Sequence, residues 1–152
     1  MERIKSFQVD HTKLLPGLYV SRVDGDVTTF DLRFKKPNQG DLLSNVAMHT
    51  LEHMYATFLR NSELSDNIIY FGPMGCQTGF YLLTRGLDNK AVYELLLKTT
   101  KDILDYEGEV FGKSAKECGN YKSLDLNEGK KEAEKYLKVL SDLKDLSLAY
   151  EE

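Results

Sequence analysis

The sequence predicts a single α+β domain, residues 1–152, in which an antiparallel β-sheet carries its helices mainly on one face. Two observations predict this fold class. A hairpin signal comes first, and a helix, a second pair of strands and two more helices follow it along the chain. The chain also contains no internal repeat or linker, and 152 residues are enough to bury one core. Strands that pair with their sequence neighbours, mixed with such helices, are typical of the α+β class.

The first two strands are predicted at 18–23 and 27–35, on either side of Asp24-Gly25. Asp-Gly tolerates the positive φ of a tight hairpin turn. In the second strand, Phe30-Asp-Leu-Arg-Phe34 alternates apolar and charged residues. Successive side chains of a strand point to opposite faces, so the two charged side chains face away from the apolar side.

A long helix is predicted next, from about Ser44 to Arg60. One stripe of this helix is apolar at helical spacing and should face the core. A neighbouring stripe of the same helix carries two histidines and a glutamate. The core stripe is Ala47, Leu51, Met54 and Phe58, and its neighbour is His49, Glu52, His53 and Ala56.

Two further strands are predicted at 68–71 and 79–84, and a glycine-rich stretch separates them. That stretch, residues 72–79, contains three glycines and Cys76. Glycine is favoured where a turn is tight or where another backbone approaches closely. We therefore expect a tight loop that presents Cys76.

The remaining elements are helical. Asp88-Asn89 is a predicted cap for a helix that Gly108 ends, and residues 114–117 have the form of a capping box on a single turn. A last helix is predicted at about 127–140. The polar stretches 6–11 and 141–152 are predicted to be extended and frayed, respectively. The inward-facing residues of the two long helices are Val92, Leu95, Leu96, Ile103, Ala133, Tyr136, Leu137 and Leu140.

Composition excludes several classes of protein. The formal net charge is −4, which lacks the basic excess of a nucleic-acid binder. No stretch has the apolar length of a membrane span, and the first residues lack the apolar segment of a signal peptide. We therefore expect a cytoplasmic protein that binds neither nucleic acid nor membrane. In that reducing compartment a disulfide between Cys76 and Cys118 is disfavoured.

The strongest chemical signal is His49-Thr-Leu-Glu-His53. Histidines four residues apart lie on one side of a helix, and Glu52 lies on the same side. Two imidazoles with a neighbouring carboxylate suit metal-assisted proton chemistry. The order H-x-x-E-H is the reverse of the common metalloprotease motif. The sequence therefore predicts a divalent metal site on this helix.

The third ligand is open among Cys118, His11 and several glutamates. Cys118 is preferred, because thiolate with imidazole suits Zn²⁺ or Fe²⁺. The alternative for Cys118 is a buried free thiol. Cys76, in its glycine-rich loop, is either a thiolate base or nucleophile or a small residue that fits a tight turn. Arg33, on the polar face of its strand, is expected to be a solvated charge or to pair with Asp31. His11, a lone histidine near the N-terminus, is expected to be exposed.

Two alternative functions fit the histidine motif. The first is an H-x-x-E-H zinc peptidase, in which Glu52 activates water and a downstream glutamate is the third ligand. Three glutamates, at 128, 132 and 134, are available for that role. The second is a non-catalytic metal-binding module, in which Cys76 closes the site as a fourth ligand.

Five stretches of the chain, in order, resemble the S-ribosylhomocysteine lyase (LuxS) family. The resemblance runs from Ser6 to Tyr121 and extends less distinctively through the last helix. It departs from the family at Tyr70-Phe71-Gly72, where many members carry an acidic and a hydroxyl residue. The matching stretches are Ser6-Phe-x-x-x-x-His11, Phe30-Asp-Leu-Arg-Phe34, Met48-His-Thr-Leu-Glu-His53, Gly72-Pro-Met-Gly-Cys-Gln-Thr-Gly-Phe-Tyr81 and Glu117-Cys-Gly-Asn-Tyr121.

The resemblance implies an α+β homodimer with two sites at the subunit interface. It implies cleavage of S-ribosyl-L-homocysteine to L-homocysteine and 4,5-dihydroxy-2,3-pentanedione, the autoinducer-2 precursor used in quorum sensing. The route moves the sugar carbonyl along the chain through enediolates and ends in β-elimination of homocysteine, which returns to the activated methyl cycle.

The resemblance also implies roles for matching residues. His49, His53 and Cys118 would hold one Fe²⁺ per subunit, with Zn²⁺ or Co²⁺ as substitutes. Cys76 and Glu52 would be the catalytic acid and base. The substrate-binding residues would be Ser6, His11 and Arg33, the first two approaching from the partner subunit.

Overall fold

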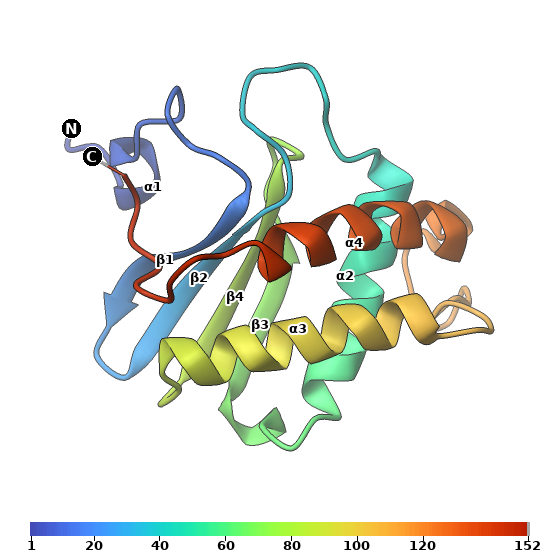
Figure 1. The fold of residues 1–152 in the computed structure, drawn as a ribbon. Helices are drawn as coiled ribbons and strands as arrows, with labels where there is room; N and C mark the ends of the chain where they lie inside the picture. Colours follow the sequence, from blue (N-terminus) through green and yellow to red (C-terminus); the bar gives the residue numbers. More distant parts are fainter. Residues whose placement is uncertain (152) are drawn as a thin grey trace.

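Residues 1–151 are described by a computed structural model, which Figure 1 shows as a ribbon. These described residues form one antiparallel sheet and four α-helices, together with two short 3₁₀ turns. The predicted α+β class is therefore confirmed. In chain order the elements are α1 Lys5–Gln8, β1 Gly17–Asp24, β2 Val27–Arg33, α2 Asn45–Arg60, η1 Ser65–Asn67, β3 Ile68–Pro73, β4 Gly79–Arg85, α3 Asn89–Asp105, η2 Tyr121–Ser123 and α4 Leu126–Ser141.

The sheet has the strand order β1-β2-β4-β3, and every neighbouring pair is antiparallel. In β2 and β4, Arg33 lies opposite Gly79. A Cβ atom on Gly79 would come within 2.1 Å of the Leu32 carbonyl oxygen. The close backbone approach expected in the glycine-rich stretch is confirmed at this position, where only glycine fits.

The helices pack on the apolar face of the sheet through aromatic side chains. The Phe34 ring, just after β2, stacks on Tyr136 of α4 with centroids 3.9 Å apart. Tyr55 of α2 stacks on Phe71 of β3 at 5.0 Å. Large rings in such contact bury much apolar area and fix helix position. In Figure 1, α3 and α4 cross in front of the sheet.

Each long helix begins at a side-chain cap that satisfies a free backbone N–H. Ser44 accepts from the Ala47 N–H, Asp88 from Ala91 and Asp125 from Glu128. The predicted bounds of the three long helices therefore agree closely with the structure. In the predicted core stripe of α2, three residues are buried, whereas Phe58 is half-buried against the core.

Two predictions near the first hairpin are wrong in detail. Residues 5–8 form α1 rather than extended chain, because the Phe7 N–H donates to the Ile4 carbonyl at 3.0 Å and closes a turn. Strand β2 ends at Arg33, because the N–H groups of Phe34 and Lys35 both donate to the Thr78 carbonyl at 2.9 Å. Those two amides thus leave the sheet ladder and bind the Cys76 loop.

The segment after α4 does not fray, contrary to prediction. Residues 142–151, hereafter the tail segment, run back over β1 toward α1 (Figure 1). The Val20 N–H donates to the Leu148 carbonyl at 2.7 Å, and the Leu148 side chain is only 4% exposed. Asn89 of α3 donates to the Leu146 carbonyl at 2.9 Å. Glu152 lies outside the described residues.

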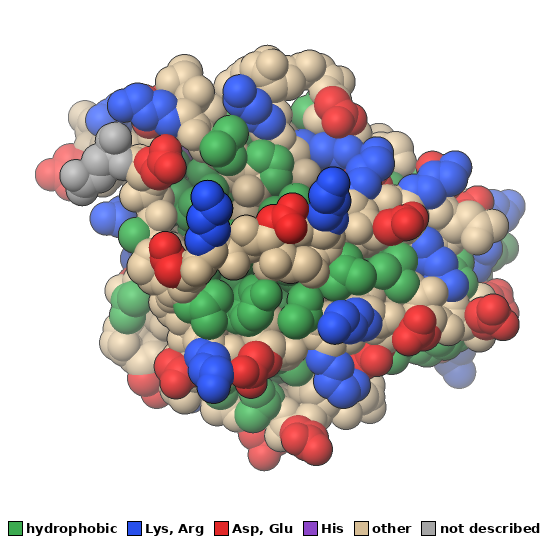
Figure 2. All heavy atoms as spheres, viewed as in Figure 1, with side chains coloured by type: hydrophobic (Ala, Val, Ile, Leu, Met, Phe, Trp, Pro, Cys, Tyr) green, Lys and Arg blue, Asp and Glu red, His purple; other side chains and the backbone are tan. Residues whose placement is uncertain are grey.

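The surface over α3 and α4 carries interspersed acidic and basic side chains, with apolar side chains showing between the two helices (Figure 2). This mixture agrees with a formal net charge of −4. Within residues 1–151, no helix combines the length and the apolarity needed to cross a bilayer.

Candidate metal centre and active site

Helix α2 sets the position of both predicted histidine ligands. Asn45 begins the helix, so His49 and His53 lie on its second and third turns. Their ring centroids are 4.7 Å apart and the rings are nearly perpendicular, at 89°. Both side chains are half-buried, beside the core stripe rather than in it. The i, i+4 geometry predicted from the sequence is confirmed.

A backbone contact orients the His53 ring. Its Nδ1 lies 2.7 Å from the Phe111 carbonyl oxygen, which accepts only from a protonated nitrogen. Nε2 is then left with its lone pair free to bind a metal. Gly112 follows with φ of +73°, and a Cβ there would lie 3.1 Å from Nδ1. The loop after α3 therefore fixes both the tautomer and the ring.

Cys118 completes the cluster from a turn after α3. The Cys118 N–H donates to the Ser114 carbonyl at 3.0 Å, which closes the single turn predicted at 114–117. Its Sγ lies 3.4 Å from His49 Nε2 and accepts from the Asn120 N–H at 3.4 Å. An N–H directed at sulfur stabilises thiolate. Gly119 has an ordinary φ and open space around it, so the turn does not depend on a glycine there.

The donor atoms of His49, His53 and Cys118 all lie within 4.8 Å of one another. Two imidazole nitrogens and one thiolate are a set that binds Zn²⁺ or Fe²⁺ and leaves a fourth position open. The residues present therefore fit a divalent metal. Of the three kinds of third ligand left open by the sequence, the structure brings Cys118 to the two imidazoles.

Among the described residues, the group of candidate ligands around the two histidines contains no glutamate, and two of the three glutamates open to the peptidase alternative pair with lysines. Glu132 lies 2.7 Å from Lys35 Nζ in a largely buried ion pair. Burial lowers the pKa of Lys35, but hydrogen bonding and charge from Glu132 outweigh it, and the net pKa is raised. Glu128 pairs with Lys131 in the first turn of α4. The structure thus gives the H-x-x-E-H peptidase no support.

An open hollow of about 370 Å³ adjoins the cluster. Glu52 and His53 of α2 line it together with Phe111 and Gly112 of the orienting loop. Arg60, at the end of α2, and Tyr70 of β3 lie on the same hollow. Glu52 is therefore beside the cluster and open to a small ligand, as a proton-transfer group needs to be.

Cys76 lies at an exposed position in the turn between β3 and β4. The Met74 N–H donates to the Gly79 carbonyl at 2.9 Å, and Gln77 has φ of +63°. The Gln77 carbonyl accepts from Leu43, directly before the Ser44 cap of α2, at 2.9 Å. The loop is thereby fastened to the end of α2 that carries His49.

A chain of hydrogen bonds links Cys76 to a buried ion pair. Cys76 Sγ is 3.0 Å from Thr78 Oγ1, which accepts from Arg33 Nη1 at 2.8 Å. Arg33 in turn donates to both carboxylate oxygens of Asp31, at 3.1 and 2.6 Å. Asp31 and Arg33 are 0% and 2% exposed. Arg33 is therefore not the solvated charge that its strand pattern suggested; it is the Asp-paired one.

The surroundings keep Arg33 charged. Burial alone lowers the pKa of Arg33, but the charge and hydrogen bonds of Asp31 more than offset this, and the net pKa is raised. Tyr81 lies near the same charges, and burial followed by Asp31 raises its pKa. The Arg33 guanidinium is thus a fixed cation two hydrogen bonds from the Cys76 sulfur.

Ser6 and His11 lie elsewhere. Figure 1 shows α1, which contains Ser6, beyond the edge strand β1 and away from α2. His11 is half-buried, with Nδ1 at 2.8 Å from the Val9 carbonyl. Within one chain the structure therefore does not bring these two residues to the cluster.

Sequence reasoning missed two residues at the site. Thr78 carried a weak signal, a hydroxyl two positions from Cys76 on a loop judged to be tight. Tyr150, whose hydroxyl donates to Asp31 at 2.6 Å, carried none, because no local pattern pairs a residue of the tail segment with one 119 positions earlier.

Comparison with known proteins agrees with this geometry. The sequence model of the family S-Ribosylhomocysteinase (LuxS) matches residues 4–145. The chain is 46% identical to an S-ribosylhomocysteine lyase of Finegoldia magna, with 100% of both chains covered. It is 49% identical to one of Desulfotalea psychrophila (99% of each) and 50% identical to one of Phocaeicola vulgatus (90% and 89%). The chain belongs to the S-ribosylhomocysteinase (LuxS) family.

Proposed function

We propose that this protein is a metal-dependent carbon–sulfur lyase that cleaves S-ribosyl-L-homocysteine to L-homocysteine and 4,5-dihydroxy-2,3-pentanedione, the autoinducer-2 precursor. One observation carries the proposal. A sulfur and two imidazole nitrogens converge from α2 and the 114–118 turn, while a second thiol, Cys76, is held separately by Thr78. The family's chemistry needs both sulfurs in these different roles.

His49, His53 and Cys118 would hold the metal ion, which we propose to be Fe²⁺, with Zn²⁺ or Co²⁺ as substitutes. A bound divalent ion would act as a Lewis acid on the sugar carbonyl. The chain's own part is to fix the three donors. The Phe111 carbonyl sets the His53 tautomer, and the Asn120 N–H supports the Cys118 thiolate.

Cys76 and Glu52 would move the protons. Moving a carbonyl along the sugar requires a base to take a proton from one carbon and return it to the next. Cys76, as a thiolate beside Thr78 and Arg33, suits that task. Glu52, on the hollow next to His53, suits proton exchange with the sugar hydroxyls and with departing homocysteine.

Arg33, Ser6 and His11 are proposed to contact the substrate, the latter two from a partner subunit. Within the single chain, α1, which contains Ser6, lies on the far side of β1 from α2 (Figure 1). Two neighbours on the same segment, Ile4 and Phe7, are 58% and 65% exposed. Apolar side chains on a short exposed helix favour burial against a second copy. We therefore propose a cytoplasmic homodimer with both sites at its interface.

The deciding experiment is an anaerobic assay of free-thiol release from S-ribosyl-L-homocysteine, run beside peptide hydrolysis and metal analysis. The lyase proposal expects thiol release and no peptidase activity. Cys76→Ala should keep its metal and lose turnover, because Cys76 is not a ligand. If Cys76→Ala instead loses the metal, Cys76 closes a structural site and the lyase proposal fails.

A further inference from the structure

We propose that Tyr150, in the tail segment, is a positioning residue for the active site: through Asp31 it holds Arg33 against Thr78, and so sets the surroundings of the Cys76 thiol. Tyr150 lies outside residues 4–145 that the family's sequence model matches. The inference rests on the proposed function, since it concerns the proton-transfer role assigned there to Cys76.

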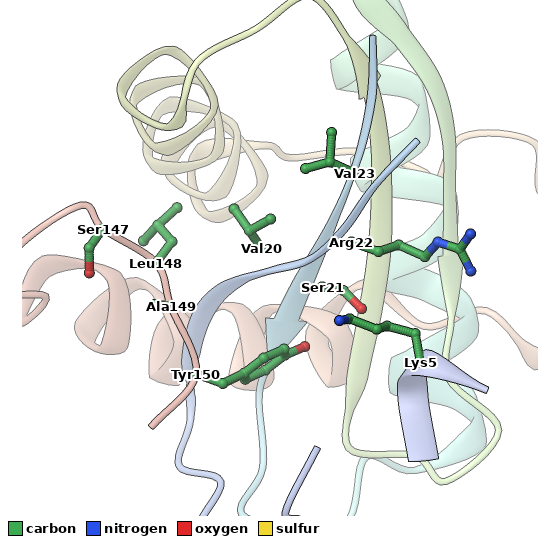
Figure 3. A pocket seen from close by; sticks show the side chains of 9 residues that line it. All are labelled: Lys5, Val20, Ser21, Arg22, Val23, Ser147, Leu148, Ala149 and Tyr150. Carbon is green, nitrogen blue, oxygen red and sulfur yellow. The ribbon is translucent and has the colours of Figure 1, made fainter. Parts of the chain in front are cut away.

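The tail segment is seated, not loose. Figure 3 shows Leu148 and Val20 side by side, with the Tyr150 ring reaching across β1 toward Ser21. The Val20 N–H donates to the Leu148 carbonyl at 2.7 Å, and Leu148 adopts φ of +52°. A non-glycine residue in this region is mildly strained. Its buried side chain and the backbone hydrogen bond offset that cost and fix the direction of the next residues.

Two independent contacts fix the position of Tyr150 relative to Asp31. Its ring stacks on Tyr19 of β1, with centroids 4.8 Å apart and an angle of 20°. Its hydroxyl donates to Asp31 Oδ2 at 2.6 Å. Tyr19 lies opposite Asp31 in the sheet, so the stack places the hydroxyl over the carboxylate. Burial, followed by the Asp31 charge, raises the pKa of Tyr150 well above its usual value, so the donor keeps its proton.

The contact extends to the Cys76 loop. Asp31 Oδ2 accepts from both Tyr150 and Arg33 Nη2, each at 2.6 Å. Arg33 Nη1 donates to Thr78 Oγ1 at 2.8 Å, so the Thr78 hydroxyl hydrogen is free to point at Cys76 Sγ, 3.0 Å away. A hydroxyl that accepts from a cation is a stronger donor. The path therefore runs Tyr150, Asp31, Arg33, Thr78, Cys76.

Because the Asp31–Arg33 ion pair is buried, its geometry depends on the hydrogen bond from Tyr150. An ion pair removed from water is stable only when its remaining lone pairs are satisfied and its geometry is fixed. Tyr150 supplies a third hydrogen bond to Asp31 and covers it. Without the hydroxyl, Asp31 takes its third hydrogen bond from water. Arg33 then gains freedom to leave Thr78, and its charge is screened from Cys76.

The test is the alkylation rate of Cys76 by iodoacetamide in Tyr150→Phe, which keeps the ring on Tyr19 and removes only the hydroxyl. The thiolate displaces iodide to form a thioether, so the rate follows the thiolate fraction. Mass spectrometry of the two cysteine peptides separates Cys76 from Cys118. The matched control is Tyr93→Phe, which loses a tyrosine hydrogen bond to the Leu140 carbonyl, on α4.

We expect Tyr150→Phe to slow Cys76 alkylation about threefold to tenfold near neutral pH, with the rates converging with wild type as the pH approaches about 10, where an ordinary thiol is ionised. Tyr93→Phe should match wild type. An unchanged rate in Tyr150→Phe would overturn the proposal. So would an equal loss in Tyr93→Phe, because that indicates general loosening.

A double-mutant cycle with Thr78→Val tests the path itself. If Tyr150 acts through Thr78, Tyr150→Phe should add little to the effect of Thr78→Val, whereas independent sites add. Full additivity would overturn the path. Alkylation needs no turnover, so the outcome is separate from that of the proposed function: a wild-type protein that releases no thiol from S-ribosyl-L-homocysteine refutes the lyase alone.

Discussion

The His53 ring is oriented by one backbone carbonyl, that of Phe111. The size of the next residue, Gly112, therefore decides whether the ring can keep that orientation. Gly112 has φ of +73°, and a Cβ atom at this position would lie 3.1 Å from His53 Nδ1. The absence of a side chain therefore leaves room for the His53 ring. Gly25, in the first hairpin, has a similar φ of +62° with nothing within 4 Å. Alanine would therefore be similarly strained at either position, but only at Gly112 would its Cβ contact His53.

Gly112→Ala and Gly25→Ala are therefore a matched pair. Each should lose about 1 kcal/mol of unfolding free energy, because alanine disfavours a positive φ. Only Gly112→Ala should weaken metal binding, by about 10- to 100-fold, since it displaces the group that orients His53. Urea unfolding of the metal-free proteins and chelator competition measure the two effects. Equal metal affinities would contradict the orienting role of the loop.

The proposed division between ligands and proton-transfer residues gives a second prediction. Glu52→Gln should retain stoichiometric metal and lower kcat roughly 10²- to 10⁴-fold, the usual contribution of a general acid or base. His49→Ala should lose the metal instead. Metal analysis and thiol release on the same preparations separate the two classes. Near-normal homocysteine release by Glu52→Gln would remove Glu52 from the mechanism.

At the scale of elements, α2 and α4 cross at a contact too tight for a methyl group. A Cβ on Gly129 of α4 would lie 2.9 Å from Thr50 Cγ2 on α2. Thr50 is fully buried, and its Oγ1 accepts from the Asp125 N–H at 2.9 Å, just before α4 begins. The hydroxyl therefore anchors the rotamer that directs the methyl group at Gly129.

Gly129→Ala should destabilise the protein by about 1–3 kcal/mol, although alanine favours an isolated helix by nearly 1 kcal/mol over glycine. The double variant Thr50→Ser/Gly129→Ala should recover most of this, because serine keeps the hydroxyl for Asp125 and removes the methyl group. Urea midpoints of the single and double variants test the coupling. A stabilised Gly129→Ala would show that helix propensity outweighs the contact.

The sequence predicted elements well where one periodic signal dominated. The spacing of Leu51 and Met54 located α2, and with it the histidine pair. The sequence left the third ligand open. Cys118 and His49 are 69 positions apart along the chain, and no local pattern predicts that two such distant residues meet. The tail segment was mispredicted for a related reason. Leu148 and Tyr150 lie in a short stretch without helical periodicity, and only the assembled sheet gives them partners.

At the scale of the whole molecule, buried tyrosines couple folding to alkaline pH. Burial raises the pKa of Tyr55 and of Tyr136 well above 10.0, their ordinary value. Above that value the unfolded chain loses protons that the folded chain retains. The stabilisation is therefore complete below about pH 10 and declines as pH rises further.

Each such tyrosine should contribute a slope of up to about 1.4 kcal/mol per pH unit to the loss of unfolding free energy. Tyr55→Phe should flatten the decline while costing little at neutral pH beyond the hydrogen bond to Thr100. Urea unfolding at a series of alkaline pH values, with tyrosinate absorbance recorded in parallel, measures both. Parallel declines in the two proteins would assign the alkaline sensitivity to other groups.

The tail segment also bears on whether the protein aggregates. An unpaired outer strand offers a row of amides and carbonyls on which another polypeptide can assemble, a common origin of fibrous aggregates. In this fold β1 is such an outer strand, and the Leu148 carbonyl already occupies the Val20 amide on it. The tail segment thus satisfies one backbone amide of this edge strand. A version shortened before Leu148 should scatter more light as its concentration rises, whereas the full chain should not.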